Sequence, residues 1–182
     1  MFPILDTTLD TTLATTWKKT WQPEFVGTLM FVVKDRRVLL IHKKTGHGAG
    51  KINGPGGKIH PGESVLDCAI RETQEEVGIT PLEPKCVLEM RFVEENGPQW
   101  LGFACIASDH IGEHSETEEA KPFWCDFDDI PYTQMWPDDA VWLPRIMEGE
   151  ITTPLVADFL FRNGELLDHQ WINVESVIDA FG

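Results

Sequence analysis

Three glutamates near the middle of the chain are spaced so that their carboxylates could act together. Glu72, Glu75 and Glu76 occupy positions i, i+3 and i+4, which project in nearly the same direction from an α-helix. Like charges at i and i+4 destabilise a helix by roughly 0.2–0.5 kcal/mol, so the arrangement needs a reason. A hard divalent cation binds carboxylate oxygens and keeps positions open for a phosphate ligand. The spacing therefore indicates either a solvated acidic face or a metal site that acts on a phosphate compound.

The segment around the glutamates has the signals of a short helix behind a glycine-rich loop, Gly54-Pro55-Gly56-Gly57. Ser64 is a suitable N-cap, and Gly78 stands where a left-handed C-terminal cap would fall. Side chains at three- and four-residue spacing predict one core-facing stripe, with the glutamates on the opposite side: Leu66, Ala69, Ile70, Thr73 and Val77. This context favours the metal site over the solvated face.

The stretch 57–79 resembles the signature of the Nudix family. That signature reads Gly, five residues, Glu, seven residues, then Arg-Glu-U-x-Glu-Glu-x-Gly-U, where U is apolar. The matching positions are Gly57, Glu63, Arg71, Glu72, Glu75, Glu76, Gly78 and Ile79. Thr73 departs from the pattern, which prefers an aliphatic residue there, and we expect a small loss of packing with no loss of chemistry.

From about residue 27 to 174 the chain is similar to one branch of that family, the MutT-like diphosphatases of oxidised purine nucleoside triphosphates such as 8-oxo-dGTP. The run Met135-Trp136-Pro137-Asp138-Asp139 is more selective than the Nudix signature, which hydrolases of many nucleotides share. Further counterparts are Lys43-Lys44, Gly48-Ala49-Gly50, Asn53-Gly54, Gly56-Gly57-Lys58, Trp124 and Trp142.

The resemblance implies roles for individual residues. It implies Mg²⁺, with Mn²⁺ possible, held by the Gly56 carbonyl and by Glu72, Glu75, Glu76 and Glu119, while Glu63 and Arg71 orient the helix carboxylates. The implied catalytic residues are Glu63, Arg71, Glu72, Glu75, Glu76 and Glu119. The implied substrate-binding residues are Thr28, Lys43, Asn53, Gly57, Lys58, Trp136, Asp138, Asp139 and Trp142, with Lys43 at the phosphates and Trp136 stacked on the purine.

The implied reaction is attack of water on a phosphoanhydride of a nucleoside triphosphate, which gives a monophosphate and pyrophosphate. Metal ions would neutralise developing charge and polarise the water, and a carboxylate would accept its proton. Glu72, Glu76 and Glu119 are all candidates for that base.

The Asp138-Asp139 pair has two interpretations. Pro137-Asp138-Asp139 before Ala140 is a sound helix start, with acid at the positive end of the helix dipole. Beside Trp136, the same pair could bind a purine edge, one carboxyl accepting a base N–H and a protonated neighbour donating. The two roles are compatible.

Three positions depart from the similar diphosphatases and leave the substrate open. His47 stands where they have Phe, Ala120 replaces a pocket Met, and Glu94 falls near an aromatic. The alternatives are a Nudix hydrolase of another nucleotide, such as a nucleoside diphosphate sugar or a dinucleoside polyphosphate, and a non-catalytic Nudix-derived binding module. The intact glutamates of the signature count against the binding module.

Composition narrows the partners. The chain has 182 residues, 42% of them apolar and 25% charged, and a net charge of −15. This charge argues against a nucleic-acid polymer as partner, whereas a bound metal lets an acidic protein act on a small nucleotide. The four cysteines are scattered, which indicates reduced thiols in the cytoplasm. We expect neither a membrane span nor a signal peptide.

Residues 1–24 are expected to be an N-terminal extension to a hydrolase domain at 25–182. Leucines and tryptophans recur every four residues in the extension and favour a short docked element over a disordered tail: Leu5, Leu9, Leu13, Trp17 and Trp21. We expect a monomer, with a dimer contact through the extension as the alternative.

The rest of the chain reads as strands with two helices. Strands are expected at 26–33, 37–42, 85–93, 100–108, 123–127, 155–161 and 166–172, paired in part as hairpins over Lys34-Asp35-Arg36 and Asn163-Gly164. A second helix is expected over 135–148. This layout is α+β, and the resemblance implies the Nudix fold, an α/β/α sandwich with a mixed β-sheet.

Overall fold

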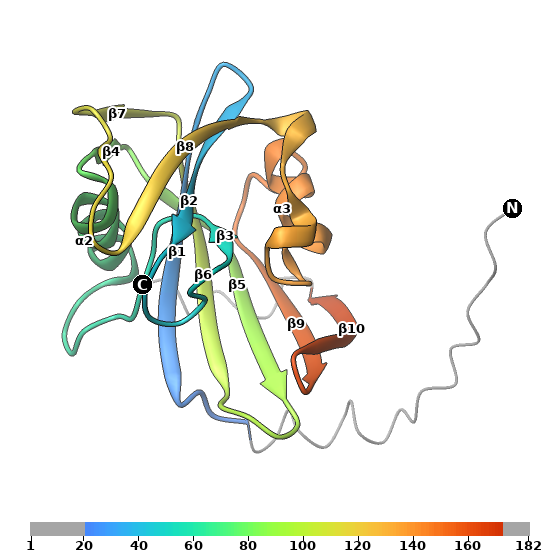
Figure 1. Ribbon diagram of the computed structural model, residues 1–182. Helices are drawn as coiled ribbons and strands as arrows, with labels where there is room; N and C mark the ends of the chain where they lie inside the picture. Colours follow the sequence, from blue (N-terminus) through green and yellow to red (C-terminus); the bar gives the residue numbers. More distant parts are fainter. Residues whose placement is uncertain (1–20, 173–182) are drawn as a thin grey trace, which may run out of the picture.

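One mixed β-sheet organises the protein in the computed structural model, which describes residues 21–172 (Figure 1). Its strand order is β10-β9-β5-β6-β1-β2-β3, and β8 pairs with β2. The strands are β1 (Phe25–Lys34), β2 (Arg37–Lys43), β3 (Ile52–Asn53), β5 (Lys85–Glu94), β6 (Trp100–Ala107), β8 (Ala120–Asp126), β9 (Leu155–Arg162) and β10 (Glu165–Ile172). The pairs β1–β6 and β5–β9 are parallel and the others antiparallel.

Two helices cover opposite faces of this sheet, α2 (Val65–Val77) on one side and α3 (Asp139–Met147) on the other (Figure 1). Alternation along the strands explains why both faces are buried. On β1, Met30 belongs to the cluster beneath α2 and Phe31 to the cluster beneath α3. On β2, Leu39 faces α2 and Leu40 faces α3. The α+β class and the helix–sheet–helix sandwich are confirmed.

Both expected hairpin turns are present. The β1–β2 turn has Asp35 at φ 52° and Arg36 at φ 56°, and the β9–β10 turn has Asn163 at φ 53° and Gly164 at φ 79°. Positive φ at both central residues is the geometry of a type I′ turn, whose twist matches that of the flanking strands. β1 pairs with β2 only next to the turn that joins them, at Val33 and Lys34, and pairs with β6 over the rest of its length.

Helix α2 begins and ends at the expected residues. Ser64 Oγ accepts a hydrogen bond of 3.1 Å from the Asp67 N–H, and Gly78 has φ 80° in the left-handed region. Thr73 lies on the buried face, where its hydroxyl donates to the Ala69 carbonyl at 2.7 Å, so a polar atom at this apolar position is satisfied. Glu76 is also buried, contrary to the expectation that all three helix glutamates lie opposite the core.

Several elements differ from the expected ones. Helix α3 begins at Asp139 rather than Met135, because two short 3₁₀ turns at Phe127–Asp129 and Tyr132–Gln134 bring the chain to it. The short strands β3, β4 (Thr80–Leu82) and β7 (Asp109–Ile111) were not predicted, since two or three residues are too few to show alternation. β4 and β7 pair only with each other.

The start of the chain lies mostly outside the described residues, including Leu5, Leu9, Leu13 and Trp17 of the four-residue repeat. Trp21 is described, and its indole N–H donates to the Gln99 side chain at 3.1 Å. Among residues 21–172, no helix is long and apolar enough to cross a membrane.

A substitution in the glycine-rich loop tests how closely it must approach β1. A Cβ on Gly56 would lie 2.0 Å from the Thr28 carbonyl oxygen, so the G56A variant must move backbone away from backbone. We expect the free energy of unfolding to fall by about 1–3 kcal/mol or more, measured by urea denaturation.

The G102A variant is the control. There the new Cβ meets the ring edge of Phe92 at 2.9 Å, and a side chain can rotate away. A G56A protein no less stable than G102A would contradict the close approach.

Candidate active site

The glycine-rich loop at residues 54–57 lies between β1 and α2 and delivers the helix to the site. The Met30 N–H donates to the Pro55 carbonyl at 2.8 Å, and the Thr28 N–H donates to the Gly57 carbonyl at 2.9 Å. A Cβ on Gly57 would lie 2.4 Å from the Glu72 carboxyl carbon. The absence of side chains therefore lets the loop reach β1 on one side and the Glu72 carboxylate on the other.

Arg71 binds three carboxylates with one guanidinium group. It forms two hydrogen bonds with Glu63, at 2.7 and 3.0 Å, and one each with Glu72 at 2.8 Å and Glu75 at 2.9 Å. The hydrogen bonds from Arg71, together with the His60 N–H, lower the pKa of Glu63 to about 2. Arg71, in the middle of α2, therefore links Glu63, which precedes the helix, to the carboxylates of the helix itself.

Glu76 occupies a different environment from its two neighbours. Its side chain is 1% exposed and forms an ion pair with Lys43, whose side chain is 14% exposed. The second carboxylate oxygen accepts a 3.0 Å hydrogen bond from the Gly56 N–H. Burial raises the pKa of Glu76, while Lys43 and the Gly56 N–H act in the opposite direction.

The expectation that Glu72, Glu75 and Glu76 gather at one point is not met in this arrangement. Within residues 21–172, no three His, Cys, Asp or Glu side chains are grouped closely enough to hold a metal ion. The reason is that Arg71 holds Glu72 and Glu75, whereas Glu76 turns inward to Lys43.

The oxygens present nevertheless suit a cation. The Lys43 ammonium contacts both the Glu76 carboxylate and, at 3.5 Å, the Gly56 carbonyl. The ammonium therefore lies between two of the expected metal ligands, the Glu76 carboxylate and the Gly56 carbonyl. The expected ligands are all oxygens, which matches Mg²⁺ or Mn²⁺.

A cavity of about 550 Å³ opens beside the loop and the helix, a volume within the range of small-molecule sites. Eleven of the expected site residues line it: Thr28, Lys43, Asn53, Gly56, Gly57, Lys58, Glu72, Glu119, Trp136, Asp138 and Asp139. The remaining ones, Glu63, Arg71, Glu75, Glu76 and Trp142, are not part of its wall.

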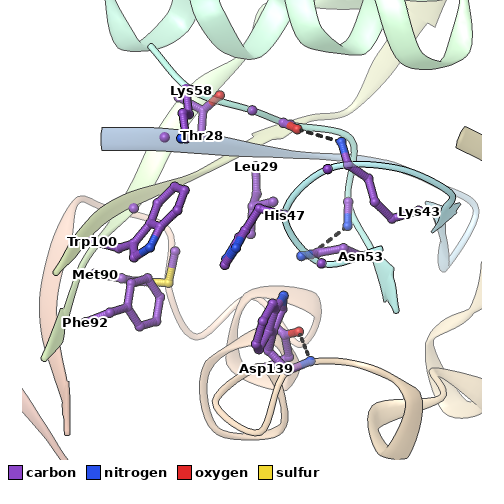
Figure 2. Close-up of a pocket in the computed structure, with 18 of the residues that line it drawn as sticks. Thr28, Leu29, Lys43, His47, Asn53, Lys58, Met90, Phe92, Trp100 and Asp139 are labelled. Atoms are coloured by element: carbon purple, nitrogen blue, oxygen red, sulfur yellow. Dashed lines mark hydrogen bonds between the residues drawn. The ribbon is translucent and has the colours of Figure 1, made fainter. Parts of the chain in front are cut away.

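Aromatic rings fill the middle of the cavity (Figure 2). The His47 imidazole is stacked against Trp100, with ring centroids 4.4 Å apart, and against Trp136, at 5.1 Å. Figure 2 shows His47 between the Trp100 side of the cavity and the side that carries Asn53 and Lys43. Burial and the nearby Lys58 and Lys43 charges lower the pKa of His47, which favours a neutral stacked ring.

Asp138 and Asp139 are buried side by side in the cavity wall, at 4% and 1% exposure. Asp138 accepts a 2.9 Å hydrogen bond from the Trp142 indole, and Asp139 accepts one of 2.9 Å from the Trp136 N–H. Burial raises the pKa of Asp138 to about 6, and burial with the neighbouring Asp138 charge raises the pKa of Asp139 well above its ordinary value. Two adjacent carboxyls of this kind can be one donor and one acceptor.

Comparison with known proteins supports the family. A family model described as the NUDIX domain matches residues 23–146. The chain belongs to the Nudix family.

Similar proteins include two that are named oxidized purine nucleoside triphosphate hydrolase. The one from Mus musculus is 38% identical over 122 residues, covering 66% of this chain and 78% of that protein. The one from Danio rerio is 39% identical with the same coverage. Among solved structures, the MutT protein from Bacillus halodurans matches with a TM-score of 0.71 and 28% identity over 81% of this chain and 97% of its own.

The acidic pair of this Nudix protein both begins a helix and lines the cavity. Asp138 is the N-cap of α3 but makes no side-chain capping bond, and the Asp139 carboxylate binds an N–H that precedes the helix. The helix-start interpretation is confirmed, because Asp138 is the N-cap and Asp139 lies in the first turn, although the Asp138 side chain forms no cap hydrogen bond. Trp142, expected to line the pocket, lies fully buried behind it and supports Asp138 instead.

Part of the Nudix cavity was not found from the sequence. Met90, Phe92, Trp100 and Phe161 form an apolar wall contributed by β5, β6 and β9. Alternation along 85–93 could have placed Met90 and Phe92 on one face of the strand. It could not have shown which face of the strand meets the glycine-rich loop. Glu94 lines the mouth and accepts hydrogen bonds from the Asn163 and Gly164 N–H groups at 2.9 and 3.0 Å.

Ala120, expected to widen the pocket, is fully buried in the cluster beneath α2 and does not line the cavity. An alanine in place of the methionine at position 120 therefore does not enlarge the cavity. His47 has the larger effect on the site, because its ring occupies space between two indoles.

The W142F variant tests the support of Asp138. It removes the indole N–H, which stabilises the ionised carboxylate, and keeps an aromatic ring in the core. We expect the pKa of Asp138 to rise above about 6, so that its titration, followed by carbon-13 NMR of the carboxyl group, moves about one pH unit higher.

W124F makes the same chemical change at an indole that is outside the cavity lining. It should leave the titration of Asp138 in place. A titration midpoint that W142F does not change would contradict the role of Trp142.

Proposed function

We propose that the protein is a metal-dependent pyrophosphohydrolase that cleaves oxidised purine nucleoside triphosphates, of the 8-oxo-dGTP type, to the monophosphate and pyrophosphate. Such an activity removes damaged nucleotides from the pool. The buried Asp138–Asp139 pair beside Trp136 carries the proposal, because it lines the same cavity as Glu72 and Glu119. The names of the relatives from mouse and zebrafish support the same substrate class.

The acidic pair suits a purine edge because its two carboxyls can differ in protonation. An ionised carboxylate accepts a base N–H, and a protonated one donates to a base oxygen. The raised pKa values of both groups favour a proton shared between them. Exchanging donor and acceptor roles would let the pair bind several oxidised purines.

Asn53 supplies a further polar group at the cavity wall. Its carbonyl oxygen accepts the Gly54 N–H at 2.8 Å, which leaves the amide N–H groups for a ligand. Trp136 would stack on the base, while Thr28 lines the same space and donates its hydroxyl to the Cys68 thiol at 3.4 Å. A purine would therefore meet one amide, two carboxyls and an indole face.

The phosphates would lie toward the helix carboxylates. Gly56 through its carbonyl, with Glu72, Glu75, Glu76 and Glu119, would hold Mg²⁺ or Mn²⁺, which neutralises developing charge and polarises the attacking water. Arg71 and Glu63 would keep the helix and the loop in register, a role that their two hydrogen bonds support. Lys43 and Lys58 supply positive charge along the cavity wall for the phosphate chain.

The remaining expectations stay proposals. We propose a division into an extension at 1–24 and a hydrolase domain at 25–182, a monomeric state and a cytoplasmic location. The substrate is a small nucleotide rather than a nucleic-acid polymer, consistent with the net charge of −15.

The substrate prediction compares 8-oxo-dGTP with dGTP. We expect a higher kcat/KM for 8-oxo-dGTP, because a base that fails to match a buried polar group leaves it unpaired at a cost of about 1–3 kcal/mol, or roughly 5- to 150-fold. Pyrophosphate release in Mg²⁺ should be measured over oxidised and normal triphosphates, nucleotide sugars and dinucleoside polyphosphates.

Asp138→Ala and Asp139→Ala should remove most of that preference while hydrolysis of whatever binds continues. Asp128→Ala, at a carboxylate outside the cavity, is the matched control. Equal kcat/KM for 8-oxo-dGTP and dGTP in the unmodified protein would contradict the sanitising role, and a preference for a nucleotide sugar would replace it.

The metal prediction concerns Glu76. Glu76→Gln should reduce kcat to less than about a tenth, a barrier change of more than about 1.4 kcal/mol, with the fold retained. Glu83→Gln, the same change at a site outside the cavity lining, should leave kcat unchanged. Activity should also disappear after exhaustive chelation and return with Mg²⁺ or Mn²⁺, so full activity in chelator would contradict the metal requirement.

A further inference from the structure

Lys43 lines the cavity with a side chain that is largely buried. Its side chain is 14% exposed and contacts the Glu76 carboxylate and, at 3.5 Å, the Gly56 carbonyl. Figure 2 shows the side chain directed to the glycine-rich loop, with a dashed line to a backbone oxygen. Both acceptors are oxygens that we assign to a divalent cation.

An ammonium group and a divalent cation cannot occupy this position together. Mg²⁺ lies about 2.1 Å from each oxygen ligand, inside the distance of about 2.8 Å at which a lysine nitrogen meets a carboxylate. Two like charges at such separations also repel strongly in a buried site. Binding of the metal at Glu76 and Gly56 therefore requires Lys43 to leave.

The Lys43–Glu76 ion pair stabilises the buried Glu76 carboxylate while no metal is bound. Glu76 is 1% exposed, and a buried carboxylate without a counter-charge is unfavourable. Lys43 supplies that charge, and the Gly56 N–H supplies one hydrogen bond. A divalent cation would neutralise the charge of Glu76 in place of Lys43, so the ammonium would no longer be held at the carboxylate.

Only the side chain of Lys43 is free to move. Its N–H donates to the Lys51 carbonyl at 2.9 Å, its carbonyl accepts from the Gly50 N–H at 2.8 Å, and it pairs with Ala120 across β2 and β8. Four methylene groups let the ammonium swing without a backbone change. Because Lys43 lines the cavity, the released ammonium remains within it.

We propose that Lys43 is an exchange cation: a divalent metal displaces its ammonium from Glu76 and Gly56, and the released ammonium then binds the phosphates of the nucleotide. The second half rests on the proposed function, whereas the first half concerns the metal alone. The exchange makes phosphate binding by Lys43 depend on prior metal binding.

Nuclear magnetic resonance of nitrogen-15-labelled lysine ammonium groups tests the displacement directly. In metal-free protein we expect a protected Lys43 signal, assigned by its absence in Lys43→Arg. Saturating Mg²⁺ without nucleotide should shift or broaden that signal beyond detection. The Lys58 signal should change little, because Lys58 lies over the Phe25 ring at 3.7 Å rather than on a carboxylate. A Lys43 signal that saturating Mg²⁺ leaves unchanged would overturn the proposal.

Metal affinity gives an independent measure, obtained with Mn²⁺ by electron paramagnetic resonance and without nucleotide. If Lys43 occupies the site nine-tenths of the time, Lys43→Met should tighten the Mn²⁺ Kd by about tenfold, since apparent affinity scales with the competent fraction. Lys58→Met removes the same charge from the same cavity wall without touching Glu76, and we expect a change below about twofold. Equal effects of the two variants would show general charge repulsion and overturn the exchange.

Thermal unfolding separates exchange from a purely structural ion pair. Lys43→Met should lower the Tm in chelator, because Glu76 loses its partner, and Mg²⁺ should raise its Tm more than that of the unmodified protein. A Tm deficit that persists in Mg²⁺ would contradict the exchange.

The last measurement addresses the phosphate half. With any nucleoside triphosphate that the protein hydrolyses, Lys43→Met should raise KM by about tenfold or more while Mn²⁺ binds more tightly. Tighter metal binding with an unchanged KM would overturn this half only. Failure to hydrolyse oxidised purine triphosphates would contradict the proposed substrate and leave the metal measurements intact.

Discussion

The close approach of the glycine-rich loop to β1 is the constraint on which the rest of the site depends. Residues 54–57 hydrogen-bond to β1 at a separation that a Cβ on Gly56 would not permit, since it would lie 2.0 Å from a backbone oxygen. The same loop admits the Glu72 carboxylate over Gly57 and gives the Gly56 N–H to Glu76. Moving the loop outward would separate the helix carboxylates from the cavity and leave a buried charge without its donor.

The loop also lies between two chemically different sides of the site. On the helix side, charged groups are paired within the protein, through Arg71 for Glu63, Glu72 and Glu75 and through Lys43 for Glu76. On the other side, carboxyls are buried among aromatic rings, and their raised pKa values follow from that burial. The two sides therefore differ in charge pairing and in burial, and the proposed positions of the phosphates and of the base follow that difference.

His47 belongs to the aromatic side, because its ring stacks on Trp100 and on Trp136. The glycines on either side of it have positive φ, 71° at Gly46 and 83° at Gly48, which places the loop in a conformation that other residues rarely adopt. A base that stacks on Trp136 at this face must take space that His47 now fills. The departure from Phe at this position thus lies at the centre of the site rather than at its edge.

Local patterns in the sequence determined the elements and the family. Capping residues bounded α2, and the Asn163-Gly164 turn dipeptide marked the last hairpin. The spacing of Glu63, Arg71 and the helix glutamates carried the Nudix resemblance. Each of these signals depends on residues near one another in the chain. Tertiary structure decided the rest: that Glu76 turns inward to Lys43, that Trp142 supports Asp138 from behind, and that β5, β6 and β9 supply the apolar wall. These features depend on strand order and on contacts between distant segments, and helical or strand periodicity specifies which residues share a face but not what that face meets.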